Sequence, residues 1–160
     1  MTDDARFEDG DERPLHLSAL DSEDLRVISA LVQDAVLPAA ETRWDGRRRR
    51  LALLINRLRR EDPAVAAGRR APERVQAVLV IDGVLGVASQ GVDRSDPDTV
   101  LAVLAVAFEP YAAAPPGGAV VVTLAGDGAI RATVEAIDVT LRDVTRPYRA
   151  PSGRVPDHGA

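Results

Sequence analysis

The chain has 160 residues, which suits one domain, and its 46% hydrophobic content is enough to build a single core. It contains no cysteine, which excludes disulfides, thiolate nucleophiles and cysteine-ligated metals. The formal net charge of -5 gives the molecule as a whole no electrostatic preference for a polyanion or an anionic membrane. With no secretory signal and no apolar run near the roughly 20 residues that span a bilayer, we expect a cytoplasmic protein without membrane contact.

The two ends of the chain differ from its middle. Residues 1–13 are acidic with few large apolar groups, and residues 149–160 are interrupted by proline and glycine. Both compositions are typical of disordered tails. We therefore expect one domain over residues 14–148.

The clearest helix signal lies within residues 19–38. Asp21 is placed to cap it, and Leu20 and Leu25 occupy the staple positions. An apolar stripe at helical spacing follows, and Pro38 stops further winding. The stripe consists of Leu25, Ile28, Val32 and Ala35.

Asp-Gly pairs at 45–46, 82–83 and 127–128 predict three hairpins, because this dipeptide supplies the positive φ angles of tight turns. A two-residue loop in the first hairpin would pair Trp44 with Arg47 and Glu41 with Arg50. Its second strand is apolar on both faces at 51–55, which predicts a central strand whose charged ends reach water.

In the second hairpin, one face would carry alternate apolar residues, namely Val75, Ala77, Leu79, Ile81, Val84 and Ala88. In the third, a three-residue loop with Gly128 left-handed would oppose Leu124 to Ile130. The first residues of the segment 95–110 have the pattern of a helix start, whereas its last residues fit a strand equally well. Residues 137–144 either follow a bulge or form a separate element.

These elements predict an α+β fold. One N-terminal amphipathic helix packs on an antiparallel sheet or open barrel of six to seven strands built from three hairpins.

A family resemblance rests on two motifs, "LHLSALDSEDLRVISALVQDAVLP" and "RRRRLALLINRLRR". On these residues the chain resembles an uncharacterised alphaproteobacterial family, the domain of unknown function 2948 family. The resemblance covers about residues 14–148. It implies a small bacterial protein but no activity.

An arginine-rich hairpin at 43–60 is the first candidate site, for a partner or an anion. Its candidate residues are Arg47, Arg48, Arg49, Arg50, Arg57 and Arg59. They would form a basic collar on both faces of the strand, and aromatic stacking residues are only 3% of the chain. Nucleic-acid binding is therefore disfavoured. The simpler interpretation is that the arginines protect an apolar strand from aggregation.

Three polar residues in apolar surroundings form the second candidate, a polar pocket: Gln33, Asp34 and Asn56. Their simpler role is to satisfy backbone groups or neighbouring loops.

Enzyme chemistry has little support in the sequence. His16 and His158 stand far apart, which disfavours zinc, and His16 fits a solvent-facing strand. Glu135 and Asp138 could form a pair, but carboxylates at a strand end are usually solvated. We therefore expect no catalytic residue, metal or cofactor.

The favoured function is a non-catalytic accessory or protein-interaction module. Anion or nucleic-acid binding through the 43–60 hairpin is the alternative. The oligomeric state stays open.

Overall fold

A computed structural model describes residues 14–62, 67–68, 73–93 and 95–149 of the chain. The expected tails at 1–13 and 149–160 lie outside these residues except for Arg149, which belongs to the last strand. Within the described residues one α-helix, one short 3-10 helix and eleven strands form, and all strands join one sheet. None of these described segments is a helix with the length and apolar character needed to cross a bilayer.

The sheet is antiparallel at every strand pair of the described residues, and its order is β1-β10-β5-β4-β2-β7-β8-β9-β6. Two short strands lie beside this path: β11 pairs with β5, and β3 pairs with β4. In chain order the strands are β1 (His16–Ala19), β2 (Val36–Pro38), β3 (Thr42–Asp45), β4 (Arg50–Leu58), β5 (Glu73–Asp82), β6 (Val84–Gln90), β7 (Val100–Pro110), β8 (Gly118–Leu124), β9 (Gly128–Val134), β10 (Val139–Asp143) and β11 (Tyr148–Arg149).

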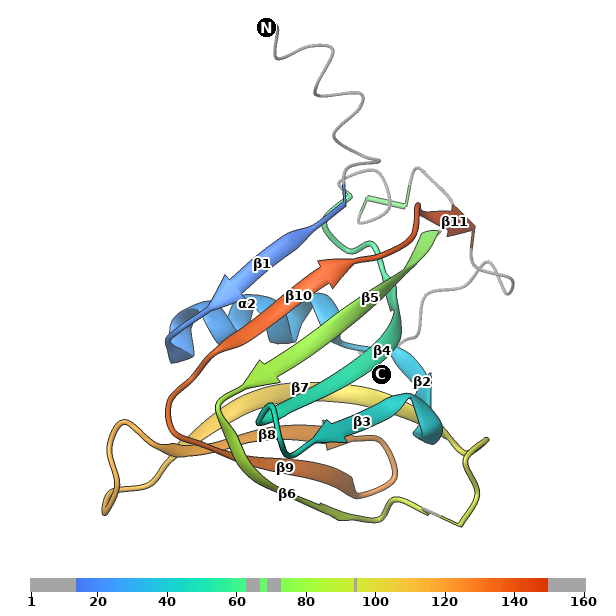
Figure 1. Ribbon diagram of the computed structural model, residues 1–160. Coiled ribbons are helices and arrows are strands. Elements are labelled where there is room, and N and C mark those ends of the chain that lie inside the picture. The colour runs from blue at the N-terminus through green and yellow to red at the C-terminus, as the bar shows by residue number, and fades with distance from the viewer. Residues whose placement is uncertain (1–13, 63–66, 69–72, 94, 150–160) are drawn as a thin grey trace, which may run out of the picture.

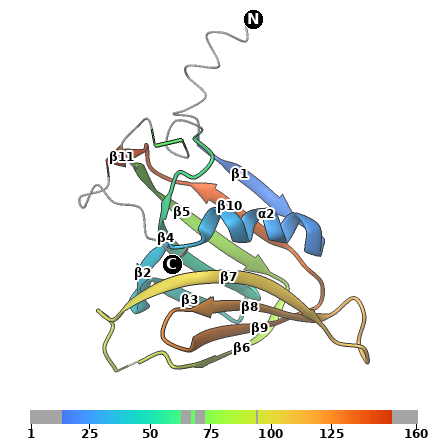
Figure 2. The same cartoon turned by 180° about the vertical axis from the view of Figure 1, so that it is seen from behind.

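The α+β class with a mostly antiparallel sheet is confirmed, but the prediction of six to seven strands was too low. Figures 1 and 2 show two halves of the strongly curved sheet, with β1, β10, β5 and β4 in one and β7, β8, β9 and β6 in the other. The three-residue strand β2 joins them, because it pairs with β4 on one side and β7 on the other.

The helix α2 (Ser22–Val32) begins as the sequence predicts but ends earlier. The Asp21 side chain accepts a hydrogen bond from the backbone N–H of Asp24 at 2.8 Å, which satisfies one free donor of the first turn. Winding stops at Val32 because Asp34 takes a positive φ of 69°, and Pro38 lies in β2. The staple is absent, since Leu20 is 71% exposed.

Leu25, Ile28 and Val32 of α2 are buried in the same hydrophobic cluster as the inner residues of the strands. The Ser29 hydroxyl accepts a hydrogen bond from the backbone N–H of Val106 on β7 at 2.9 Å. Figure 2 shows α2 beside β7.

The first predicted hairpin exists, but its register is wrong. Thr42 pairs with Leu53, Trp44 with Leu51 and Asp45 with Arg50, so the loop holds the four residues 46–49. Asp45 Oδ1 accepts hydrogen bonds from the backbone N–H groups of Arg47 and Arg48 at 3.1 and 3.2 Å. Asp45 therefore organises a longer turn with its side chain, as aspartate often does. The predicted pairing of Glu41 with Arg50 does not occur.

The second predicted hairpin does not form. Strand β5 pairs with β4, β10 and β11, whereas β6 pairs with β9. Gly83, with a φ of 69°, turns the chain from one half of the sheet to the other. The inward face of β5 is predicted correctly, since Val75, Ala77, Leu79 and Ile81 are fully buried, but Ala88 on β6 is exposed.

The third hairpin forms from β8 and β9 with a three-residue loop, as predicted. Leu124 pairs with Gly128 rather than Ile130, a slip of two residues that leaves the predicted buried face unchanged. Positive φ angles occur at Gly126 and Asp127 rather than Gly128.

The two undecided segments are now settled. From Val100 onward, the segment 95–110 is strand β7. Residues Val139–Asp143 form the separate strand β10, between β1 and β5.

Candidate functional site

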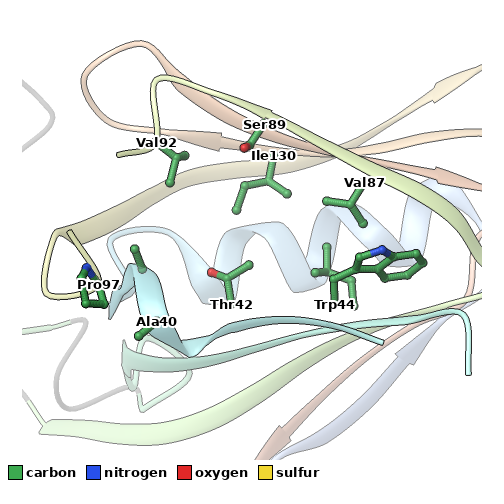
Figure 3. Close-up of a pocket in the computed structure, with 10 residues that line it drawn as sticks. Ala40, Thr42, Trp44, Val87, Ser89, Val92, Pro97 and Ile130 are labelled. Carbon is green, nitrogen blue, oxygen red and sulfur yellow. The ribbon is translucent and has the colours of Figure 1, made fainter. Parts of the chain in front are cut away.

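An apolar groove lies where the two halves of the sheet come apart. Strand β3 continues along β4 beyond β2, and among the described residues it has no partner on its other side. Strand β6 ends the sheet order and pairs with β9 alone. Between these strands lies a cavity of about 310 Å³ (Figure 3). Its lining consists of Ala39, Ala40, Thr42, Trp44, Leu51, Val87, Ser89, Val92, Pro97 and Ile130.

Backbone hydrogen bonds hold two segments of the groove lining together. The 3-10 helix η1 (Ala39–Glu41) donates two backbone hydrogen bonds to the loop before β7, from Ala39 N to Thr99 O at 2.8 Å and from Ala40 N to Pro97 O at 3.1 Å. These bonds hold η1 against Pro97, so this part of the lining is fixed by backbone contacts.

Thr42 is a polar residue of this lining whose hydroxyl oxygen is shielded from the open cavity. Thr42 Oγ1 is buried and has no hydrogen-bond partner among the described residues. Figure 3 shows Thr42 on the β3 side of the groove, facing Ile130 and Ser89 across it. A buried hydroxyl without a partner costs roughly 1–3 kcal/mol, so its presence requires an explanation.

Trp44 forms part of the β3 wall and is 42% exposed. Its ring lies over Gly46, since an added Cβ at that glycine would be 3.7 Å from Cζ2 of the ring. Aromatic side chains that are half exposed at a concave surface are common binding anchors. Trp44 is also the chain's single tryptophan.

The turn at 46–49 carries the exposed arginines of the first candidate site. Arg47 and Arg48 are exposed, and Arg48 Nε lies 3.8 Å from Asp45 Oδ2. Arg49 Nη1 binds Glu135 Oε1 and Arg50 Nε binds Asp82 Oδ1, both at 2.8 Å. The Asp82 contact is the main cause of a raised pKa at Arg50.

Arg57 and Arg59 do not reach water, contrary to the expected basic collar. The Arg57 side chain is 0% exposed and binds Asp143 and Glu61. Burial by itself lowers the pKa of Arg57, but the hydrogen bonds and charges of Glu61 and Asp143 outweigh it and raise the pKa. Arg59 Nη1 lies 3.0 Å from Glu73 Oε1 and 3.6 Å from Asp62 Oδ2.

The six candidate arginines therefore fall into two groups. Arg47, Arg48, Arg49 and Arg50 lie at the exposed turn, whereas Arg57 and Arg59 are buried. Arg50 is the first residue of β4 and Arg57 is the last but one, so seven residue steps separate their backbones by about 23 Å. No single surface gathers the whole set.

The second candidate, the polar pocket, is partly assembled. Arg60 donates from Nη2 to Asp34 Oδ2, and Arg74 Nη1 donates to Asn56 Oδ1 at 3.2 Å. The Asn56 amide also donates to the hydroxyl of Tyr148. Asp34 and Asn56 thus each bind an arginine, while Gln33 caps the C-terminus of α2. Burial is the main reason that the pKa of Arg74 is lowered.

Three of the residues considered for catalysis lie on the surface, and the fourth, His158, lies outside the described residues. His16 is exposed in β1, as the alternation predicts, and Glu135 and Asp138 are both exposed. No group of three histidine, aspartate or glutamate side chains among the described residues is arranged to hold a metal ion.

The groove is a site that the sequence did not predict. Its lining comes from η1, β3, β4, β6, the loop after β6 and β9, so only the fold brings these residues together. Trp44 was the one residue in the sequence that could have indicated this groove, because a single aromatic residue within an arginine-rich segment is unusual.

The fold and the groove define an α+β domain whose curved antiparallel sheet opens between β3 and β6. The chain belongs to the domain of unknown function 2948 family: the family model, described as a protein of unknown function (DUF2948), matches residues 15–158. No curated protein and no solved structure matched the chain.

Proposed function

We propose that the chain is a non-catalytic accessory module that contacts a partner protein, and that β6 is its contact strand. One observation carries this proposal. The outer edge of β6 has no strand partner among the described residues, and none of its seven residues is charged. We also place this module in the bacterial cytosol, which rests on the family resemblance and on the absence of cysteine.

An unpaired edge presents backbone N–H and C=O groups that an extended segment of another protein can pair with. Proteins usually protect such edges with charges, proline, short strands or bulges. The other terminal strand, β1, has only four residues. Strand β6 is longer, and its one irregularity lies between Val84 and Gly86, so residues 86–90 keep a regular register with β9.

The groove beside β6 supports the same proposal. Side chains at alternate positions of an added strand would point toward Val87, Ser89 and Trp44, which line the groove. Main-chain pairing would supply affinity and the groove would supply selectivity.

The experiment compares two charged variants, Ala88→Lys and Ser18→Lys. Ala88 is exposed on β6 and does not line the groove, while Ser18 is exposed on β1 at the opposite end of the sheet. Proteins retained from native lysate by each form are quantified by mass spectrometry, and any candidate is then titrated against the purified forms. We expect one partner that binds wild type and Ser18→Lys equally and Ala88→Lys at least tenfold more weakly.

Two outcomes would refute the proposal. One is that no retained protein distinguishes Ala88→Lys from wild type. The other is that purified wild type forms a dimer which Ala88→Lys dissociates, since β6 would then pair with a second copy of this chain.

A second candidate function, anion binding, is favoured by the exposure of Arg47 and Arg48 at the tip of the 46–49 turn. Two adjacent guanidinium groups attract phosphate or sulfate groups in a salt-dependent manner.

A further inference from the structure

We infer that the guanidinium of Arg74 and the hydroxyl of Tyr148 bind a carboxylate group at the end of the sheet where β11 pairs with β5. One edge of the guanidinium holds both carboxylate oxygens, and the tyrosine hydroxyl donates to one of them. Figure 1 shows β11 beside this end of β5, in the half of the sheet that does not contain β6. The inference therefore goes beyond the proposed contact through β6.

The guanidinium of Arg74 is held in place by one residue of the neighbouring strand. Its Nη1 donates to the backbone oxygen and to Oδ1 of Asn56 on β4, each at 3.2 Å. The opposite edge, formed by Nε and Nη2, makes no hydrogen bond within the described residues, and neither nitrogen is a buried atom without a partner. This edge is therefore fixed in position and open to a ligand, and a preorganised group loses little conformational entropy on binding.

The direction of the hydrogen bonds leaves the Tyr148 proton free. Because Oδ1 of Asn56 accepts from Arg74, the other end of the amide is its donor, and Nδ2 donates to the hydroxyl oxygen of Tyr148. The tyrosine O–H therefore does not point back to Asn56 and can donate to an acceptor outside the protein. Tyr148 is 37% exposed, so a ligand can reach it. Arg74 and Tyr148 both touch the Asn56 side chain, which brings their free donors close together.

The charge of Arg74 has no carboxylate partner among the residues that the structure describes. Its neighbour Glu73 binds Nη1 of Arg59 at 3.0 Å, and successive strand residues point to opposite faces. The nearby carboxylate of Asp34 binds Nη2 of Arg60. Burial lowers the pKa of Arg74 most, the charge of Arg60 lowers it further, and the opposing effects of Tyr148 and Asp34 do not compensate. A bound carboxylate supplies the counter-charge that this partly desolvated guanidinium lacks.

The same edge of another arginine in this protein already binds a carboxylate. Nε and Nη2 of Arg57 each donate to one oxygen of Asp143 at 3.0 Å. The spacing of these two donors matches the two oxygens of a carboxylate, so the pair forms two parallel hydrogen bonds. Arg74 offers this edge without an internal acceptor. The ligand is therefore a carboxylate rather than a spherical anion such as chloride.

The experiment titrates sodium acetate into the full chain at pH 6, with sodium chloride reduced to keep the ionic strength constant. The backbone amide NMR shifts of residues 74 and 148 report binding in every variant, and the Arg74 Nε–H resonance reports it in the wild type. We expect saturable shifts at all three groups with one dissociation constant. Chloride in place of acetate should leave them unchanged.

Arg74→Lys keeps the charge but removes the two-donor edge, so acetate should bind about fivefold more weakly or less. The matched control is Arg142→Lys, at an exposed arginine of β10, which should bind acetate as the wild type does. Tyr148→Phe removes the third donor and should weaken binding about three- to tenfold.

Asn56→Asp tests the same site without removing either donor. Aspartate has nearly the shape of asparagine and places a carboxylate beside Arg74, where it accepts from the Tyr148 hydroxyl as well. This internal carboxylate should compete with the ligand, so acetate binding should be lost. The melting temperature without acetate should rise, because Arg74 gains a counter-charge.

A second titration, with the peptide acetyl-Gly-Gly, distinguishes two sources of the carboxylate. Binding at least tenfold tighter than that of acetate would assign the site to a peptide C-terminus, and equal binding would assign it to a small carboxylic acid. The inference is overturned if acetate does not shift residues 74 and 148, if chloride shifts them equally, or if Arg74→Lys and Asn56→Asp both bind acetate as the wild type does. Because the probes are added to the isolated chain, failure of the partner proposal leaves this test unaffected.

Discussion

Arg57 and Asp143 form a double ion pair inside the protein, in which Nε and Nη2 of the guanidinium each donate to one carboxylate oxygen at 3.0 Å. The two residues lie on β4 and β10, which are separated by β5. Asp143 is opposite Ala77 of β5, and the small side chain of Ala77 leaves room for the pair to form across that strand. The contact therefore joins β4 and β10 across β5 on the buried face of the sheet.

Replacing Asp143 by asparagine should destabilise the protein by roughly 1.5–3 kcal/mol, because the buried guanidinium of Arg57 loses a charged hydrogen-bond partner while its pair with Glu61 remains. Asp143 Oδ2 also accepts a hydrogen bond from Leu15 N at 2.9 Å, so the entry to β1 loosens as well. The free energy of unfolding in urea measures the effect. The control is Asp82→Asn at the exposed pair with Arg50, which should cost less than about 1 kcal/mol. Equal losses in the two variants would contradict the importance of burial.

The stability of the protein should depend on Glu61 in acid. Burial raises the pKa of Glu61, but the hydrogen bonds and charge of Arg57 outweigh burial and hold the pKa below its ordinary value of 4.5. A carboxylate whose folded-state pKa is depressed stabilises the fold above its unfolded pKa, and this contribution is lost as the pH falls through the folded pKa.

Glu61→Gln should therefore be less stable than wild type at pH 7, and the difference should shrink as the pH falls below 4.5. Urea midpoints measured between pH 7 and pH 2.5 for the two proteins check this. A difference that stays constant with pH would show that Glu61 acts by packing rather than by charge.

Replacing the cap residue Asp21 by alanine should destabilise α2 by about 1 kcal/mol, since the backbone N–H of Asp24 loses its partner. Asp21→Ser keeps a capping oxygen and should retain most of the stability. Thermal unfolding followed by circular dichroism distinguishes the two variants. If alanine and serine behave alike, the 2.8 Å hydrogen bond contributes nothing measurable.

Anion binding predicts a salt-dependent effect at the 46–49 turn. The double variant Arg47→Ser/Arg48→Ser should lose retention on heparin at low salt, because these two guanidinium groups are exposed. The control is Arg43→Ser, an exposed arginine on β3 outside the turn. If wild type is not retained at low salt, the second candidate function is wrong.

The local parts of the fold could be predicted from the sequence. The cap at Asp21, the buried face of β5 and the three-residue loop of the β8–β9 hairpin each depend on residues close together in the chain. In each of these cases, the side-chain pattern and the structure agree because few alternative partners compete.

Long-range pairing could not be predicted. Asp82-Gly83 has the same residues as a hairpin turn, yet β6 pairs with β9 because the outcome depends on which strands are available. Arg57 shows the same limit at a single position. It continues the inward alternation of Leu51, Leu53 and Ile55, and its charge is buried against two carboxylates, Glu61 and Asp143, of which Asp143 comes from the distant strand β10.

The pairing of β6 with β9 also affects how the chain is made. Strand β9 begins 38 residues after β6 ends (128 − 90), so at a synthesis rate of about 5–20 residues per second the ribosome needs roughly 2–8 s to supply the partner of β6. During this interval neither edge of the uncharged strand β6 is paired with β9, so both edges can pair with other nascent chains. Translation speed across residues 91–127 should therefore set how much of the product aggregates.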